Sequence, residues 1–172
     1  MPERQRGAAE SRLIAPASPR ASLRALRFDL SVCIVNWNCR DVLRDCLRSL
    51  QHQSLGLRYE VIVVDNASSD GAADMVAREF PHVTLVRNTA NYGFARANNQ
   101  AARLARGKHL FFLNNDTLVP PETLGRLVEE AERRPDAGIL APRLLDARGH
   151  VQCSWRRIPT VAALLHRTWM FR

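Results

Sequence analysis

The sequence lacks any run of apolar residues long enough to span a bilayer, and no apolar stretch follows the charged residues near its amino terminus. Neither a membrane-spanning helix nor a secretory signal is therefore expected, and we predict a cytoplasmic protein. No C-x-x-C pair is present, and no histidine lies at metal-ligand spacing from a cysteine. The four cysteines are expected to be free thiols in a reducing compartment.

Lysine is almost absent, since Lys108 is the only one, and arginine supplies nearly all of the positive charge. The net charge of +8 lies at the two ends: residues 1–27 carry +4, residues 148–172 carry +5, and residues 28–147 carry −1. The middle of the chain is therefore not a basic platform, and we expect no nucleic-acid partner. Salt-dependent binding through the arginine-rich ends is the alternative.

Residues 1–29 contain arginine, alanine, serine and proline without sustained periodicity, which predicts a disordered basic leader. From residue 30, apolar runs typical of buried strands alternate with apolar positions at helical spacing. The strands are expected at 31–37, 60–65, 83–87, 109–114 and 138–142. This order predicts an α/β domain over residues 30–147, with a mostly parallel sheet and helices on both of its faces.

A polar cluster follows each of the first four expected strands. The clusters are residues 36–38, 65–70, 88–93 and 114–117. Because the carboxyl ends of parallel strands share one edge of the sheet, and ligands of open α/β sheets bind at that edge, we expect a ligand site there. A dinucleotide site is not expected, since residues 36–41 contain no glycine where the G-x-G-x-x-G motif would require three.

Each cluster also has a purely structural interpretation. Asp65 can start a turn, Asp70 can cap the next helix, and Asn91 and Gly93 can serve as turn residues with positive φ. A carboxylate at position 65 can instead accept a hydrogen bond from a base N–H or a ribose hydroxyl. For Trp37 we favour a place in the core over one beside a nucleobase.

Asn114-Asn115-Asp116 directly follows the apolar residues 110–113. A carboxylate at this position can bind a Mg²⁺ or Mn²⁺ ion that bridges two phosphates, and such an ion neutralises charge on a leaving nucleoside diphosphate. The alternative is an Asx turn that leads into Pro120 and Pro121.

Four segments, taken in order, resemble the motifs of family 2 glycosyltransferases, which have the GT-A fold. They are SVCIVNWN at 31–38, VVDNASSDG at 63–71, NTANYGFARANN at 88–99 and LNNDT at 113–117. The variant with Asn-Trp-Asn, Asp-Asn-Ala-Ser and Asn-x-Gly-Phe is similar to the rhamnosyltransferase-type subgroup, as are residues 141–145 and 152–160. The resemblance covers roughly residues 30–160.

This resemblance implies transfer of a sugar, with inversion, from a nucleoside diphosphate donor such as dTDP-rhamnose to a hydroxyl of a glycan or lipid-linked acceptor. It implies that Asp65 contacts the nucleobase and that Asp116 holds the Mg²⁺ or Mn²⁺ ion. Asn114 is a weaker ligand, because an amide oxygen adds no negative charge. The donor-binding residues implied are Asn36, Asn38, Asp65, Ser68, Asn91, Gly93, Asn98, Asn115 and Asp116.

In this family the general base and most of the acceptor site lie in a segment with a Glu-Asp-type motif, which we expect beyond Arg172. Residues 148–172 are expected to begin that acceptor-side segment, so the chain is expected to be truncated. No base is assigned, because the acidic residues at 129–132 fit a solvated helix face. The alternative is a catalytically incomplete module that binds a nucleotide sugar and needs a partner chain.

Residues 158–172 mix apolar and basic side chains. We expect this tail to pack on the sheet or on the absent half of the enzyme. The alternative is a peripheral contact with the inner face of an anionic membrane, which would suit a lipid-linked acceptor.

Overall fold

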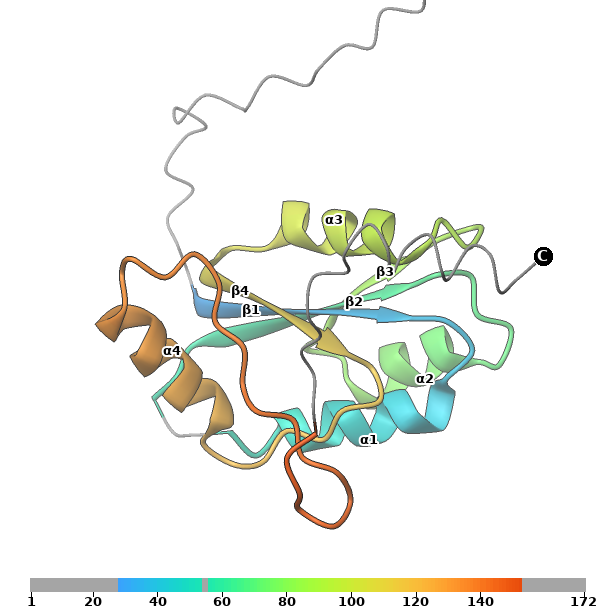
Figure 1. Ribbon diagram of the computed structural model, residues 1–172. Coiled ribbons are helices and arrows are strands. Elements are labelled where there is room, and N and C mark those ends of the chain that lie inside the picture. The colour runs from blue at the N-terminus through green and yellow to red at the C-terminus, as the bar shows by residue number, and fades with distance from the viewer. Residues whose placement is uncertain (1–27, 54–55, 153–172) are drawn as a thin grey trace, which may run out of the picture. The chain divides into compact units, whose positions relative to one another are not determined.

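The computed structural model describes residues 28–53 and 56–152 (Figure 1). Residues 1–27 of the predicted leader and the predicted amphipathic tail, together with Cys153, lie outside the described residues, whereas residues 28 and 29 of that leader belong to a strand. The chain divides into two compact units, Met1–Pro121 and Glu122–Arg172. The division follows Pro120 and Pro121, two consecutive residues without the N–H groups that regular structure uses.

Strands and helices alternate along the first unit. The elements are β1 (Phe28–Asn36), α1 (Arg40–Leu50), β2 (Tyr59–Asp65), α2 (Ala72–Glu79), β3 (Thr84–Arg87), α3 (Phe94–Leu104) and β4 (Gly107–Asn114). The strands form a four-stranded parallel sheet of order β3-β2-β1-β4. Figure 1 shows α1 and α2 on one face of this sheet and α3 on the other, so the α/β fold predicted from the sequence is confirmed.

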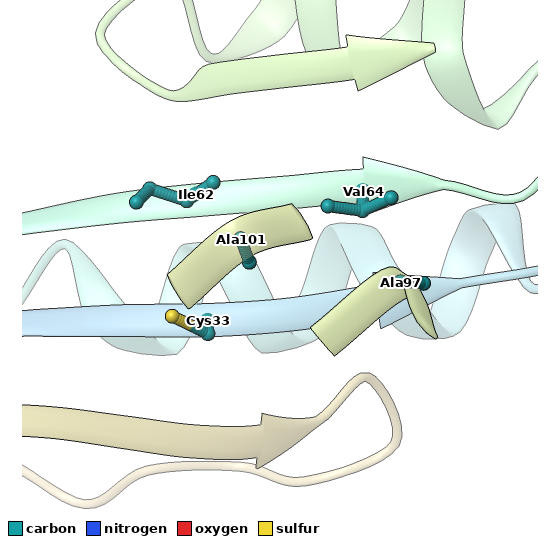
Figure 2. Close-up of a cluster of buried hydrophobic side chains, with 5 residues drawn as sticks. All are labelled: Cys33, Ile62, Val64, Ala97 and Ala101. Carbon is teal, nitrogen blue, oxygen red and sulfur yellow. The ribbon is translucent and has the colours of Figure 1, made fainter. Parts of the chain in front are cut away.

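The centre of the sheet is buried on both faces, as its apolar runs predicted. On the α3 side, Cys33, Ile62 and Val64 pack with Ala97 and Ala101 (Figure 2). The small alanine side chains let the helix lie close to the strands. Helix α1 buries Leu43, Cys46, Leu47 and Leu50, whereas Val42, which we expected in the same stripe, is exposed.

Strand β2 begins one residue earlier than predicted, and β1 and β4 begin two or more residues earlier, each for a local reason. Strand β1 begins at Phe28, because the backbone N–H and guanidinium of Arg58 both donate to the carboxylate of Asp29, at 3.0 and 2.9 Å. Strand β4 begins at Gly107, a residue that we expected to stop the preceding helix. A Cβ at this glycine would lie 2.5 Å from the backbone nitrogen of Ser31, so only glycine permits the pairing.

The spacing of apolar residues predicts helices that bury Ala73, Val76 and Ala77, and Phe94, Ala97, Ala101, Leu104 and Ala105. Both helices form, but each buries a partly different face. Helix α2 buries Ala72, Met75 and Val76, whereas Ala77 is exposed, because the helix starts directly after Gly71 in the left-handed conformation (φ 80°). Helix α3 buries its alanines but leaves Phe94 and Leu104 exposed.

The second unit contains α4 (Thr123–Arg133), which follows Pro121 as predicted. The predicted strand at 138–142 is wrong: these residues form no strand, and Ile139 is 91% exposed. An apolar run becomes a strand only when a neighbour pairs with it, and within residues 122–152 the one such pairing is an antiparallel bridge between Leu145 and Val151. No helix in the described ranges has both the length and the apolar character needed to cross a membrane.

Candidate functional site at the carboxyl edge of the sheet

The polar clusters lie at the same edge of the sheet, because all four strands run in the same direction (Figure 1). Asn36 pairs with Asp65 in the register of β1 and β2, and Val35 pairs with Asn114 in the register of β1 and β4. Asp65 in turn pairs with Arg87, the residue before the third cluster. Each strand thus ends level with its neighbour or within one residue of it, and four loops leave the same edge of the sheet.

The side chain of Asn36 lies at the centre of this edge and is fully buried. Its Nδ2 donates to Asp65 Oδ1 at 3.0 Å and to Ser68 Oγ at 3.2 Å. Its Oδ1 accepts a hydrogen bond of 2.8 Å from Asn115 Nδ2. One amide therefore connects the ends of β1 and β2 with the turn that follows β4.

Asp65 is also buried, with 3% of its surface exposed. Its Oδ1 accepts from Asn36, and its Oδ2 accepts from the backbone N–H of Ser68 at 2.9 Å. The second bond is that of a turn-starting aspartate, as the structural interpretation expected. Each carboxylate oxygen keeps a second lone pair, so the carboxylate can still accept from a ligand.

The loops after β1 and β2 are bonded to each other. Asn38 Oδ1 accepts from the backbone N–H of Ser69 at 2.8 Å, and the backbone N–H of Asn38 donates to Ser68 Oγ at 2.9 Å. Asn38 and Ala67 have positive φ, 51° and 62°. For alanine this conformation is strained, and such strain is common in functional loops.

Asp70 caps two helices. Its Oδ1 accepts from the backbone N–H of Ala72 in the first turn of α2, at 3.0 Å, and its Oδ2 accepts from the backbone N–H of Arg40 in the first turn of α1, at 2.8 Å. The N-cap residue of α2 is Gly71, so Asp70 satisfies a first-turn N–H of this helix from the position before the cap. The bond to α1 could not be read from the sequence, because it joins positions 30 residues apart.

A second amide network holds the loop after β3. Asn88 Nδ2 donates to Asn66 Oδ1 and to Gln100 Oε1, both at 2.9 Å, and the backbone N–H of Tyr92 donates to Asn66 Oδ1 at 3.4 Å. Asn66, with 2% of its surface exposed, was missed as a site residue by the sequence reasoning. The motif Asp-Asn-Ala-Ser, which contains Asn66, is the one feature of the sequence that pointed to it.

Three residues predicted to bind the donor make local hydrogen bonds in the same region. Asn91 Oδ1 accepts from the backbone N–H of Gly93 at 2.9 Å, which is the turn role we considered for both. Gly93 has a φ of 82° and immediately precedes α3. Asn98 lies one turn into that helix, and its Nδ2 donates to the carbonyl of Phe94 at 3.1 Å rather than to another loop.

The turn after β4 presents Asn114 and Asp116 as exposed residues, with Asn115 half-buried between them. The backbone carbonyl of Asn114 accepts a weak hydrogen bond of 3.8 Å from Cys46 Sγ. Burial raises the pKa of that thiol to about 12, and the negative charge of Asp116 adds to the rise. Cys46 is therefore a neutral packing residue beneath the turn rather than a thiolate ligand.

The position of Trp37 differs from the predicted one. We favoured a core position for its ring, but the side chain is 55% exposed. Successive residues of a strand point to opposite faces, but Trp37 follows the last residue of β1 and begins a bend, where that alternation no longer holds. The indole therefore lies at the rim, next to Asn38.

The chain matches the family model "Glycosyl transferase family 2" over residues 31–170. It is 31% identical over 111 residues to an uncharacterized glycosyltransferase of Haemophilus influenzae, an alignment that covers 64% of this chain and 37% of that protein. It is 30% identical over 102 residues to a poly(ribitol-phosphate) beta-glucosyltransferase of Bacillus spizizenii, covering 56% of this chain and 16% of that protein. The chain thus spans well under half the length of these curated relatives.

Among solved structures, residues 1–349 of S. aureus TarS, crystallised in complex with UDP, resemble the chain with a TM-score of 0.57. The identity is 23%, and the likeness covers 62% of this chain and 33% of that one, which supports the GT-A-like fold. The family match extends over more than three quarters of the sequence and includes all four polar clusters. The chain therefore belongs to glycosyl transferase family 2.

Proposed function

We propose that the first unit binds the nucleotide-sugar donor of a glycosyltransferase, which transfers the sugar to an acceptor hydroxyl. The observation that carries this proposal is the convergence of four polar loops at the carboxyl edge of a parallel sheet, where open α/β folds bind ligands. Membership of glycosyl transferase family 2 supports it, as does the similarity to a poly(ribitol-phosphate) beta-glucosyltransferase.

The nucleobase is proposed to lie against Asp65 and Trp37. The remaining lone pairs of the Asp65 carboxylate can accept a hydrogen bond from a base N–H, and its two bonds to Asn36 and Ser68 hold it in one orientation. The exposed indole of Trp37 offers a flat apolar surface for the base. Recognition by this pair would restrict the choice of base through the position of its N–H group.

Asp116 is proposed to hold a divalent cation, with Asn114 as a weaker ligand. Among the described residues, no three His, Cys, Asp or Glu side chains gather into a metal-binding group, so the protein offers one exposed carboxylate and amide oxygens here. This set fits Mg²⁺ or Mn²⁺, whose remaining ligands are commonly substrate phosphates and water. When bound, such an ion acts as a Lewis acid on the leaving diphosphate.

We further propose a rhamnosyl donor such as dTDP-rhamnose, transfer with inversion, and a glycan or lipid-linked acceptor, on the basis of the motif variant at residues 36–38, 65–68 and 91–94. The general base is not assigned to a described residue. Glu129 and Glu130 form ion pairs with Arg133 on α4 and have the character of a solvated helix face.

A second candidate is a module that binds a nucleotide sugar and depends on a partner chain for turnover. The hydrogen bonds of Asp65 and Asp70 favour this candidate, because the carboxylates of both residues accept from backbone N–H groups. Carboxylates bonded in this way are suited to binding and to helix capping rather than to proton abstraction. Both candidates predict donor binding, and only the first predicts transfer.

Calorimetry on the 172-residue chain tests the proposal, with UDP, dTDP, GDP and dTDP-rhamnose titrated with and without Mn²⁺. We expect Mn²⁺ to strengthen binding, and Asp116→Ala to remove that gain while leaving the metal-independent part. Asp65→Ala should weaken both parts, and Asp136→Ala, at an exposed acid of the second unit, should change neither. A folded wild-type chain that binds none of these nucleotides would overturn the proposal. Release of a nucleoside diphosphate from the donor in the presence of an acceptor glycan would distinguish an active enzyme from a module that only binds the donor.

A further inference from the structure

We propose that Asn36 is a positioning residue, which couples the carboxylate of Asp65 to the turn that carries Asn115 and Asp116 without contacting the donor itself. This differs from the expectation that Asn36 lines the nucleotide site. The nucleotide part of its test rests on the proposed function, whereas the structural part does not.

Both ends of the Asn36 amide bond to protein groups, and the side chain is closed to solvent. The residue is 0% exposed, and its Nδ2 donates both to Asp65 Oδ1 and to Ser68 Oγ. Its Oδ1 accepts from Asn115 Nδ2 at 2.8 Å. Both donor hydrogens of the amide are therefore used, and its oxygen is bonded to Asn115 and shielded from solvent, which leaves a ligand no access to it.

The bonds of Asn36 join three segments that are distant in sequence. Asp65 and Ser68 lie 29 and 32 residues away, and Asn115 lies 79 residues away. The backbone carbonyl of Asn36 also accepts from the backbone N–H of Asn66 at 2.8 Å. A displacement of any one loop would therefore disturb the partner bonds of the other two.

Only an amide satisfies both neighbours at once. It donates to the carboxylate of Asp65 and accepts from the amide of Asn115, whereas a carboxylate at position 36 would face Asp65 as a like charge. Alanine at this position would remove the hydrogen-bond donor to Asp65 Oδ1 and the acceptor for Asn115 Nδ2, and the loss of a partner is costly for polar groups away from water. The residue type is thus determined by its partners on both sides.

The coupling predicts that loss of Asn36 weakens two separable parts of nucleotide binding. The base-dependent part is measured with UMP, dTMP and GMP without metal, and the metal-dependent part is the gain in affinity of UDP, dTDP and GDP on addition of Mn²⁺. We expect Asn36→Ala to weaken both by about ten-fold or more. Asp116→Ala, in contrast, should affect only the metal-dependent part.

A charge-exchange variant, Asn36→Asp/Asp65→Asn, keeps the hydrogen-bond pattern. The carboxylate at position 36 can accept from the amide at position 65, from Ser68 Oγ and from Asn115 Nδ2, and the amide oxygen at position 65 can accept from the Ser68 N–H. We expect this double variant to restore the metal-dependent gain that Asn36→Ala loses. Base-dependent binding should remain weak, because the carboxylate has moved. Asn99→Ala, at an exposed asparagine on α3, is the matched control.

Hydrogen exchange on the 172-residue chain provides a readout that needs no nucleotide. Asn36→Ala should speed exchange of the amides at 66–69 and at 114–117, and the double variant should return both to the wild-type rate. Unchanged affinity and exchange in Asn36→Ala, or a change in only one of the two segments, would overturn the proposal. If wild type binds no nucleotide, the proposed function fails and exchange alone decides this inference. If Asn36→Ala does not fold, the double variant alone is measured. Wild-type exchange in the folded double variant supports the inference, and faster exchange of its amides at 114–117 overturns it.

Discussion

Asn88 and Gln100 form a reciprocal pair of amide hydrogen bonds, in which Asn88 Nδ2 donates to Gln100 Oε1 at 2.9 Å and Gln100 Nε2 donates to Asn88 Oδ1 at 3.0 Å. The pair joins the loop after β3 to the middle of α3. Because Asn88 also donates to Asn66, the loop that carries Asn91 and Gly93 is fixed both by the helix and by the loop after β2.

Gln100→Ala removes both bonds of this pair and leaves the half-buried amide of Asn88 with fewer partners. We expect the free energy of unfolding to fall by about 1–2 kcal/mol, measured by urea denaturation. The backbone amides of residues 88–93 should exchange faster while those of β1 remain slow. Asn99→Ala, at the adjacent exposed position, should leave both quantities unchanged. Unaltered exchange at 88–93 in Gln100→Ala would mean that the loop is held by Asn66 alone.

The parts of the fold that follow from periodicity were predicted from the sequence. Buried strands appear as uninterrupted apolar runs, and β2, with Val61 to Val64 at its centre, is buried as that pattern requires. The order of strands and helices then required a parallel sheet with its polar clusters at one edge. Asp70 was predicted as a cap for the same reason, since capping depends on residues close in sequence.

The parts that failed depend on contacts that periodicity does not report. Residues 138–142 have a strand-like composition, but a strand also needs a partner at hydrogen-bonding distance. Trp37 was assigned to the core from its apolar ring alone. The bonds of Asn66 and Gln100 to Asn88 join positions 22 and 12 residues apart, and no local pattern marks them. Such amide networks become visible only when the strands have been placed.

Glu60 is a buried carboxylate at the opposite end of the sheet from the site. Its side chain accepts from Ser31 Oγ at 2.7 Å, from the backbone N–H of Arg106 at 2.6 Å, and from the Arg106 guanidinium at 2.9 Å. Burial pushes the pKa of this carboxyl up, but the hydrogen bonds from Ser31 and Arg106 and the arginine charge outweigh burial and hold the pKa below its ordinary value of 4.5.

A lowered pKa in the folded state means that the ionised carboxylate stabilises the fold above the unfolded-state pKa and that this contribution is lost as the pH falls through the folded value. Glu60→Gln replaces one acceptor oxygen with a donor that faces Arg106. At neutral pH we expect it to lower the free energy of unfolding by about 1–3 kcal/mol. The difference from wild type should shrink as the pH falls below 4.5, measured by urea denaturation between pH 3 and 7. A difference that is constant across this range would contradict an ionised role for Glu60.

The cysteines differ in their access to reagents. Burial raises the pKa of Cys33 to about 11, with a further contribution from the charge of Glu60, and raises that of Cys46 to about 12. Cys39, at the start of α1, is partly exposed. We expect iodoacetamide at pH 8 to modify Cys39 in the folded chain while sparing Cys33 and Cys46, because the thiolate is the reactive form.

Peptide mapping by mass spectrometry identifies the modified positions. In denaturant, Cys33 and Cys46 should react as fast as Cys39, which serves as the control for reagent access. Modification of Cys46 at the rate of Cys39 in the folded chain would show that the packing beneath the turn after β4 is open.

Ala67 has a φ of 62° in the loop between Asn66 and Ser68. Glycine adopts this region without the Cβ clash, so Ala67→Gly should be neutral or stabilise the fold by up to about 1 kcal/mol, despite the added entropy of the unfolded chain. The same change at Ala102, inside α3, should destabilise it by about 1 kcal/mol. Thermal unfolding of the two variants measures this difference in sign, and destabilisation of equal size in both would contradict the left-handed conformation at position 67.

Each carboxylate oxygen of Asp70 accepts a hydrogen bond from a first-turn N–H of a different helix. A single capping residue contributes about 1 kcal/mol, so Asp70→Ala should lower the free energy of unfolding by about 2 kcal/mol. Asp70→Ser keeps one acceptor oxygen and should lose about half as much. Asp45→Ala, at an exposed acid on α1, controls for the loss of charge. If Asp70→Ser and Asp70→Ala were equally unstable, the two caps would act as one unit: release of the first turn of α1 would also release that of α2, and the loops after β1 and β2 would move together.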